Sequence, residues 1–192
     1  MHKYLSILLT ILQACNSKAE SMATKYIEPA RKYVKSKNMN DDIFILIDLS
    51  KHSGKNRFYV YSFSKNEIIM SCLVSHGCGN KTWSKANQPA NPVVSNELNS
   101  HCSSIGKYKI GERGYSQWGN NIKYLLHGLE SSNSNAAVRN IVLHSWGAIS
   151  EKEIYPLGSP EGWGCPAISN SDMSKIDKLL KNSKPTLMWV IN

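Results

Sequence analysis

The run Ile43–Leu49 constrains the fold of this 192-residue chain more than any other segment. It is apolar apart from one aspartate, rich in β-branched residues and only seven residues long, which predicts a strand. Two further segments, 57–64 and 67–75, predict a hairpin across Lys65 and Asn66. The first third of the chain therefore predicts a β-sheet.

The remaining segments predict more strands and two helices. Strands are expected at Gly106–Ile110, Lys123–Leu126, Ile141–His144 and Thr186–Ile191, and the polar residues 77–103 form a long loop. Residues 19–37 predict an amphipathic helix in which Pro29 favours a kink. Residues 171–181 predict a second helix capped by Ser171. The predicted fold is mainly β, with an N-terminal helix and a short C-terminal helix.

Composition indicates one globular domain with a basic surface. A chain of 192 residues that is 41% hydrophobic and 9% aromatic can bury a core. Its net charge of +9 suits anionic surroundings such as nucleic acid, acidic lipid or an acidic cell wall. The sequence has no helix-turn-helix, no zinc-finger spacing and no basic run interleaved with aromatics, which argues against a nucleic-acid partner.

The N-terminus has the features of an export signal. Lys3 precedes the apolar stretch Leu5–Leu12, which is too short to span a bilayer and resembles a signal-peptide core. The following Leu12–Cys15 resembles a bacterial lipobox, with Cys15 as the lipidated residue. These features predict an exported, periplasmic or cell-envelope lipoprotein anchored to the membrane. The alternative is that the stretch is the apolar face of a first helix.

One cysteine and one histidine form a candidate catalytic pair. Cys165 lies between a glycine and Pro166, 21 positions after His144, which ends an apolar run. A thiol beside an imidazole can become a thiolate nucleophile, and backbone N–H groups crowded around it can hold an oxyanion. The alternative interpretation is an inert buried cysteine in a turn.

An ordered series of short motifs extends this pattern along the chain. The motifs are Ser53–Val60, Ser75–Gly77, Ser103–Tyr108, Gly114–Ser116, Leu126–Leu129, Val142–His144 and Trp163–Ala167. Together they resemble the murein L,D-transpeptidase catalytic domain, in a variant branch where Trp precedes Gly-Cys-Pro. The resemblance covers roughly residues 26 to 169 and implies a β-sandwich or barrel of the L,D-transpeptidase type.

The resemblance also implies a reaction and its residues. Cys165 would attack the carbonyl of the third stem-peptide residue of peptidoglycan and expel D-alanine, and an amine or water would resolve the thioester. His144 would act as base, oriented by the carbonyl of Ser145. The N–H groups of Gly164 and Cys165 would form the oxyanion hole. The enzyme would be an L,D-transpeptidase or L,D-carboxypeptidase that needs no cofactor and no metal.

Substrate contacts follow from the same resemblance. His76 is expected near the cleft, and Trp146 and Trp163 flank the proposed catalytic residues, so all three are predicted to contact the stem peptide. The commoner members of the family have Arg or Asn two positions after the nucleophile, where this chain has Ala167. An expected contact to the substrate carboxylate is therefore missing.

A second cysteine offers an alternative. Ser75–Asn80 spells the motif that marks the nucleophile in the commoner L,D-transpeptidases, which would make Cys78 the nucleophile. Order favours Cys165, because the base precedes the nucleophile in those enzymes and most of the domain follows Cys78. The alternatives are a cell-wall peptidase that uses Cys78 with His144, or an inactive peptidoglycan-binding module.

The remaining cysteines allow several pairings. With Cys15 and Cys165 assigned, Cys72, Cys78 and Cys102 remain. Cys72 and Cys78 lie six positions apart along an apparent strand and cannot be bridged unless the chain bends sharply, whereas a disulfide between Cys78 and Cys102 is geometrically open. The sequence does not determine a pairing. His76, Cys78, His101 and Cys102 are also of zinc-ligand types, although their spacing matches no common zinc motif. The expected organisation is a signal peptide and lipobox at 1–15, a linker and helix at 16–40, and the catalytic domain at 41–192.

Overall fold

The computed structural model describes residues 25–192 and divides the chain into two compact units, Met1–Asn38 and Met39–Asn192. In the first unit, residues 25–36 form a helix that includes Pro29, which is the described part of the predicted helix 19–37. The predicted signal peptide, the lipobox and Cys15 lie outside the described residues. Within residues 25–192, none of the helices has the length and apolar character needed to cross a membrane.

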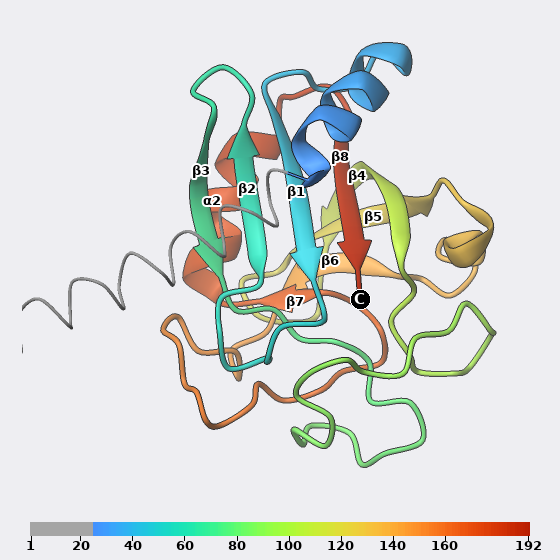
Figure 1. The fold of residues 1–192 in the computed structure, drawn as a ribbon. Coiled ribbons are helices and arrows are strands. Elements are labelled where there is room, and N and C mark those ends of the chain that lie inside the picture. Colours follow the sequence, from blue (N-terminus) through green and yellow to red (C-terminus); the bar gives the residue numbers. More distant parts are fainter. Residues whose placement is uncertain (1–24) are drawn as a thin grey trace, which may run out of the picture. The chain divides into compact units, whose positions relative to one another are not determined.

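The second unit is built around one mixed sheet of eight strands (Figure 1). The strands are β1 (Ile43–Asp48), β2 (Phe58–Ser62), β3 (Glu67–Cys72), β4 (Gly106–Tyr115), β5 (Ile122–Gly128), β6 (Val142–Ser145), β7 (Ala167–Ile168) and β8 (Thr186–Ile191). A short 3₁₀ helix η1 (Ser131–Asn133) follows β5, and helix α2 (Asn170–Leu180) follows β7. The strand order is β3-β2-β1-β8-β4-β5-β6-β7.

Two of the strand pairs are parallel and the other pairs are antiparallel. The first and last strands, β1 and β8, are parallel neighbours in the middle of the sheet, and β6 and β7 are parallel at one edge. All six residues of β1 are buried, which agrees with the continuous apolar run that predicted it. The predicted hairpin is confirmed, and Asn66 makes its turn with a φ of 57°.

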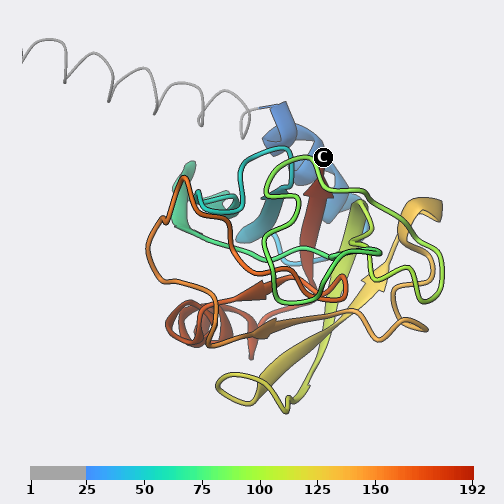
Figure 2. The same cartoon turned by 90° about the horizontal axis from the view of Figure 1, so that it is seen from below.

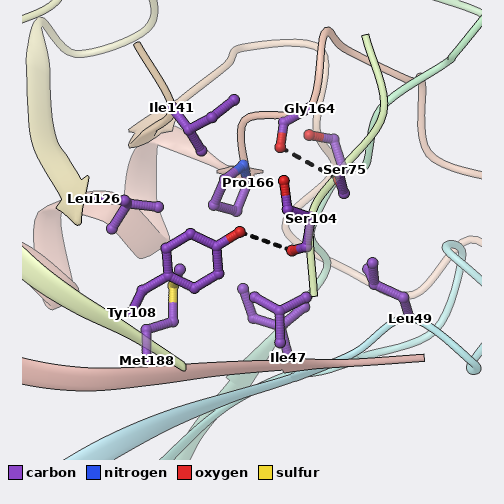
Figure 3. A pocket seen from close by; sticks show the side chains of 12 residues that line it. Ile47, Leu49, Ser75, Ser104, Tyr108, Leu126, Ile141, Gly164, Pro166 and Met188 are labelled. Carbon is purple, nitrogen blue, oxygen red and sulfur yellow. Dashed lines mark hydrogen bonds between the residues drawn. The ribbon is translucent and has the colours of Figure 1, made fainter. Parts of the chain in front are cut away.

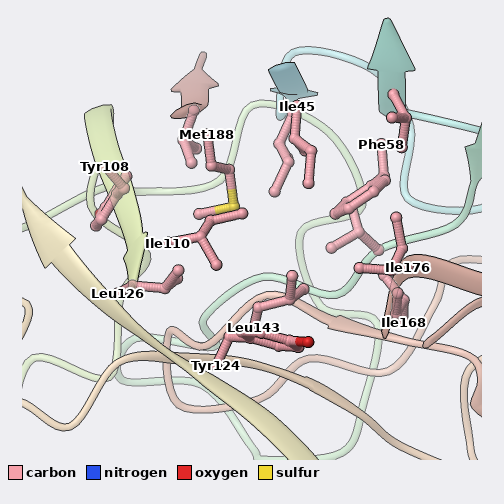
Figure 4. Packing of buried hydrophobic residues seen from close by; sticks show 14 of the residues in the cluster. Ile45, Phe58, Tyr108, Ile110, Tyr124, Leu126, Leu143, Ile168, Ile176 and Met188 are labelled. Carbon is pink, nitrogen blue, oxygen red and sulfur yellow. The ribbon is translucent and has the colours of Figure 1, made fainter. Parts of the chain in front are cut away.

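The sheet bends around its main apolar core (Figure 4). Ile45 of β1, Met188 of β8, Leu143 of β6 and Ile176 of α2 belong to this core and are essentially inaccessible to solvent. Figure 4 shows their side chains converging from opposite parts of the bent sheet. The predicted fold class, mainly β with a short helix near the C-terminus, is confirmed.

Helix α2 begins two residues earlier than its predicted cap implies. The prediction that Ser171 caps it is wrong, because the N-cap is Ser169, whose hydroxyl accepts a hydrogen bond from Asp172 N at 3.1 Å. Met173 and Leu180, with Ile176 between them, form the buried stripe of the helix. The stripe anchors the segment that directly follows β7.

Two long connections cross the same end of the sheet. They are residues 73–105, between β3 and β4, and residues 146–166, between β6 and β7, drawn in green and orange in Figures 1 and 2. An isolated parallel bridge joins Gly77 of the first connection to Gly162 of the second. This contact fixes the residues immediately before β7.

Candidate active site

The β6–β7 edge of the sheet brings the two predicted catalytic residues together. In the parallel register His144 lies opposite Ala167, and His144 N donates to Pro166 O at 3.3 Å. Cys165 lies two residues before Ala167, outside β7, and its side chain and that of His144 line the same cavity. The sequence separation of 21 residues is closed by this single strand pair.

His144 is held as a neutral imidazole. Its Nδ1 lies 2.9 Å from the carbonyl oxygen of Ser145, so Nδ1 carries the proton and Nε2 keeps its lone pair. Burial lowers the pKa of His144, with the Ser145 carbonyl opposing and the charge of Lys123 adding to the shift. A neutral ring with a free Nε2 can act as a general base.

The Cys165 thiol faces the backbone of the neighbouring strand. Its Sγ accepts from Val142 N at 3.4 Å and lies 3.8 Å from Asn140 O. Burial raises the pKa of Cys165, and the Val142 N–H and the charges of Arg139 and Lys123 oppose that shift. Within residues 25–192 no hydrogen bond joins this thiol to the His144 ring, so the resting pair is a thiol beside an imidazole.

The turn before β7 leaves two amide donors free. Gly164 has a φ of 99°, a conformation that side-chain-bearing residues rarely adopt, and an added Cβ would overlap the Cys102 carbonyl oxygen. The Gly164 carbonyl accepts from Ser103 Oγ at 3.2 Å. In the described part of the chain, neither the Gly164 nor the Cys165 N–H donates to a protein acceptor. Donors of this kind can stabilise an oxyanion.

Ser75 of the predicted Ser-His-Gly motif hydrogen-bonds to the backbone of this turn and of β7 on their buried side. Ser75 N donates to Ala167 O at 2.9 Å, and Ser75 Oγ donates to Cys165 O at 3.3 Å. Figure 3 shows Ser75, Gly164 and Pro166 on the wall of a small internal cavity of about 10 Å³, on the core side of the turn. The turn is thus held on its buried side by side chains of another loop.

His76 lies behind the site. Its side chain is completely buried, its Nδ1 accepts from Arg57 Nη2 at 2.6 Å, and its Nε2 faces Glu161 Oε1 at 3.3 Å without forming a hydrogen bond. Burial, followed by the nearby Arg57 charge, lowers the pKa of His76 to about 3. The expected direct contact of His76 with substrate does not fit this placement. The ring is a neutral part of the wall.

Glu161 connects this buried network to the nucleophile segment. It is buried, and its carboxylate accepts from Asn87 Nδ2 at 2.8 Å and from Gln88 N at 2.6 Å. Because Glu161 directly precedes Gly162, these bonds tie the 73–105 connection to the chain that carries Cys165. The sequence analysis missed this residue, since a lone glutamate before a glycine carries no recognisable signal.

A cavity of about 130 Å³ opens over the pair. His144 and Cys165 share its lining with four tryptophans, Trp83, Trp118, Trp146 and Trp163. Two of these, Trp146 and Trp163, were predicted to flank the site, whereas Trp83 and Trp118 were not. We call this space the tryptophan-lined cavity.

The other cysteines lie outside the tryptophan-lined cavity. Cys72, Cys78 and Cys102 are buried thiols, and Cys78 Sγ contacts Gly79 O at 3.6 Å. Burial raises the pKa of Cys78. Among the described residues no three His, Cys, Asp or Glu side chains are grouped to hold a metal ion. His101, one residue of the alternative zinc set, stacks on Trp163 at 5.0 Å between ring centroids.

Comparison with known families gives a match over nearly the whole chain. The model of the L,D-transpeptidase catalytic domain family matches residues 14–189. The chain belongs to this family. The resemblance inferred from the sequence motifs is therefore confirmed. No curated protein matches the chain.

Solved structures of L,D-transpeptidases show a distant likeness. An L,D-transpeptidase from Xylanimonas cellulosilytica is 12% identical with a TM-score of 0.42, and the match covers 78% of this chain and 60% of that one. An L,D-transpeptidase from Mycobacterium smegmatis is 10% identical with a TM-score of 0.45, covering 79% and 59%. The helical cell shape determining protein Pgp2 from Campylobacter jejuni is 14% identical with a TM-score of 0.44, covering 79% and 48%. This L,D-transpeptidase domain thus spans 60% or less of these three chains.

Proposed function

We propose that the chain is a peptidoglycan L,D-transpeptidase with Cys165 as its nucleophile. One observation carries the proposal: β6 pairs with β7 directly after Cys165-Pro166, and Cys165 and His144 line the same cavity. Family membership and the free N–H groups of Gly164 and Cys165 support it.

The first half-reaction forms a thioester. The thiol turns from the β6 backbone towards Nε2 of His144, which removes its proton as sulfur attacks the carbonyl carbon of the third stem-peptide residue. The carbonyl electrons move to oxygen, where the two amide donors of the turn stabilise the negative charge. When the carbonyl re-forms, the bond to the terminal D-alanine breaks. The leaving nitrogen takes the proton from the His144 imidazolium.

The second half-reaction releases the acyl group. The side-chain amine of a neighbouring stem, or water, attacks the thioester carbonyl while His144 accepts its proton. The carbon–sulfur bond breaks and the thiolate regains a proton from His144. Transfer to an amine gives a crosslink, and transfer to water gives L,D-carboxypeptidase activity. The Ser145 carbonyl keeps the proton on Nδ1 in the resting state, so Nε2 is the atom that receives and returns it.

Placement disfavours the alternative nucleophile. Cys78 is 5% exposed, lies outside the cavity that His144 lines, and contacts only a backbone carbonyl through its sulfur. A peptidase based on Cys78 and His144 would need both residues at one surface. An inactive binding module would have no need of an aligned thiol, imidazole and pair of free amides.

Product analysis with purified muropeptides tests the proposal. Wild-type protein should release D-alanine from tetrapeptide stems. Cys165→Ala should lose roughly 10³-fold or more of that activity, because the nucleophile is gone, as in other enzymes that lose their nucleophile. Cys78→Ala should keep most of the activity. Product masses distinguish crosslinked dimers from hydrolysed tripeptides. Loss of activity in Cys78→Ala with retention in Cys165→Ala would transfer the site to Cys78.

We also propose that the protein is exported to the cell envelope and anchored through Cys15. The sequence motif Leu12–Cys15 and the preceding apolar stretch support this, and peptidoglycan as substrate requires the same compartment. The stem peptide would then be the partner, with the membrane contacted through the lipid.

A further inference from the structure

Four tryptophans form one aromatic cluster at the tryptophan-lined cavity. Trp83 lies at its centre, with ring centroids 5.4 Å from Trp146, 6.2 Å from Trp118 and 6.5 Å from Trp163. Trp83 and Trp146 are stacked, with an angle of 21° between their planes, whereas Trp118 and Trp163 are tilted against Trp83. Four of the five tryptophans of the chain are thus gathered beside His144 and Cys165.

The cluster is exposed. Trp83 is 42% accessible, Trp118 is 48% accessible and Trp163 is 61% accessible, so these rings do not serve as core. A contiguous exposed apolar patch at a cavity mouth marks a binding surface. The four rings come from three connections of the chain, namely 73–105, the β4–β5 connection and 146–166, which means that the fold assembles the surface.

The polar atoms of these rings are also free. Across residues 25–192, the structure shows no hydrogen bond from the indole N–H groups of Trp83, Trp118, Trp146 and Trp163 to a protein acceptor. Each ring therefore offers an apolar face and one hydrogen-bond donor at its edge. A ligand that uses both must combine an apolar face with oxygen acceptors around its rim.

The nearby charges disfavour an ammonium group as the ligand held by the cluster. The charged groups whose fields reach Cys165 and His144 are basic, namely Lys123 and Arg139, and the residues that line the cavity include no carboxylate. The guanidinium of Arg139 donates hydrogen bonds to Ser95 O, Ser104 Oγ and Cys102 O. An aromatic cage for an ammonium group would be opposed by this positive field.

We propose that the tryptophan cluster binds a pyranose ring of the glycan strand that carries the stem peptide. This inference rests on the proposed function. One face of such a sugar presents C–H groups that pack on an indole ring, and its hydroxyl and acetamido oxygens accept from indole N–H groups. The sugar would be recognised together with the peptide that reaches Cys165.

One substrate would place its sugar on the cluster and its third stem residue at Cys165. Three stem residues separate the sugar from the attacked carbonyl, and an extended peptide of that length covers about 10 Å. The cluster lines the same cavity as Cys165, and its rings lie 5.4–6.5 Å from Trp83 between centroids. The glycan would position the stem before chemistry begins.

A substrate pair tests the inference. D-alanine release is measured with a disaccharide-tetrapeptide and with the same tetrapeptide freed of its sugars. Wild type should give a kcat/KM about tenfold higher for the glycosylated substrate, a ratio that corresponds to the loss of one stacked aromatic contact. In Trp118→Ala this ratio should fall towards one, and Trp118→Phe, which keeps an aromatic face, should restore part of it.

A matched control is an exposed aromatic residue outside the cluster. Tyr115, at the end of β4, is 71% accessible, and Tyr115→Ala should keep the wild-type ratio. A ratio of one in wild type, or an unchanged ratio in Trp118→Ala, would overturn the inference while leaving the proposed function standing. No D-alanine release from either substrate would instead overturn the proposed function.

Indole N–H resonances provide a binding readout that needs no turnover. The peptide-free disaccharide is titrated into Cys165→Ala, and the five indole signals are followed by NMR. The signals of the four clustered tryptophans should shift. The signal of Trp189 should not, because this residue lies on β8, outside the cluster, where its ring packs against Lys107 of β4. Equal shifts at all five positions, or none at millimolar sugar, would contradict the inference.

Discussion

Burial sets the charge of both proposed catalytic residues. It raises the pKa of Cys165 and lowers that of His144, so both side chains are neutral at pH 7. The resting pair is therefore a neutral thiol beside a neutral imidazole rather than a preformed thiolate–imidazolium pair. In the proposed mechanism the proton leaves the thiol during attack and passes to His144 Nε2.

Removing the base should have a pH-dependent effect. His144→Ala should slow acylation of Cys165 by a carbapenem by about 10²-fold or more at pH 7, and by less at high pH, where hydroxide ionises the thiol unaided. In wild type the rate should fall on acidification only below the ordinary imidazole pKa of about 6.5, because the folded-state pKa is lowered. Stopped-flow rates across pH 5–10 give both results.

His127 supplies the matched control for that measurement. It is exposed in part, and its Nε2 lies 2.8 Å from Glu112 Oε2, away from the tryptophan-lined cavity. His127→Ala should acylate at the wild-type rate. Equal rates in wild type and His144→Ala at every pH would show that His144 is not the activating base.

The turn before β7, at the end of the second long connection, matters more than the length of β7 suggests. β7 has two residues, yet its pairing with β6 sets where the nucleophile lies. The turn before it is fixed on three sides, by Ser75, by Ser103 and by the buried Glu161. A catalytic thiol is thus placed by loop-to-loop hydrogen bonds rather than by a long strand.

Two glycines of this turn should respond differently to alanine. Gly164→Ala places a Cβ against the Cys102 carbonyl at a φ of 99° and should cost about 2 kcal/mol or more of unfolding free energy, with loss of D-alanine release. Gly162→Ala meets open space and should change stability by less than about 1 kcal/mol. Urea unfolding of both variants measures the difference. Equal stabilities would mean that the turn relaxes freely.

The hydrophobic pattern along the sequence correctly predicted the strands whose own residues favour that conformation. The run Ile43–Leu49 contains β1 because its short series of apolar and β-branched side chains favours a buried strand, and the same kind of series forms β8 at residues 186–191. β7 was missed because two residues show no periodicity, and it forms only by pairing with β6. Ser169 rather than Ser171 caps α2, since two nearby serines offer the same hydroxyl and tertiary packing selects the start of the helix.

Part of the site is assembled only by the tertiary fold, and this part could not be predicted from the sequence. His144 and Cys165 could be predicted as a pair because each lies in a recognisable short motif. Trp83 lies in a polar loop and Trp118 in the connection between β4 and β5, and nothing local distinguishes either from a surface tryptophan. Only the fold reveals that they meet. His76 shows the reverse case, since its motif suggested the cleft and packing placed it in the wall.

At the scale of the whole molecule, a basic chain of net charge +9 suits work beside an anionic wall. Anchoring through Cys15 would keep the enzyme there. Metabolic labelling with a fatty acid should mark wild type and should not mark Cys15→Ser. An unlabelled wild type that is processed elsewhere would remove the anchor and leave export intact.

Mass spectrometry of a trapped acyl-enzyme tests most directly whether Cys165 is the nucleophile. The protein is mixed with a disaccharide-tetrapeptide without an acceptor amine, quenched in acid and digested. The peptide that contains Cys165 should gain the mass of the substrate less D-alanine, while the peptides of Cys72, Cys78 and Cys102 stay unmodified. An adduct on the Cys78 peptide, with Cys165 unmodified, would contradict the proposed mechanism.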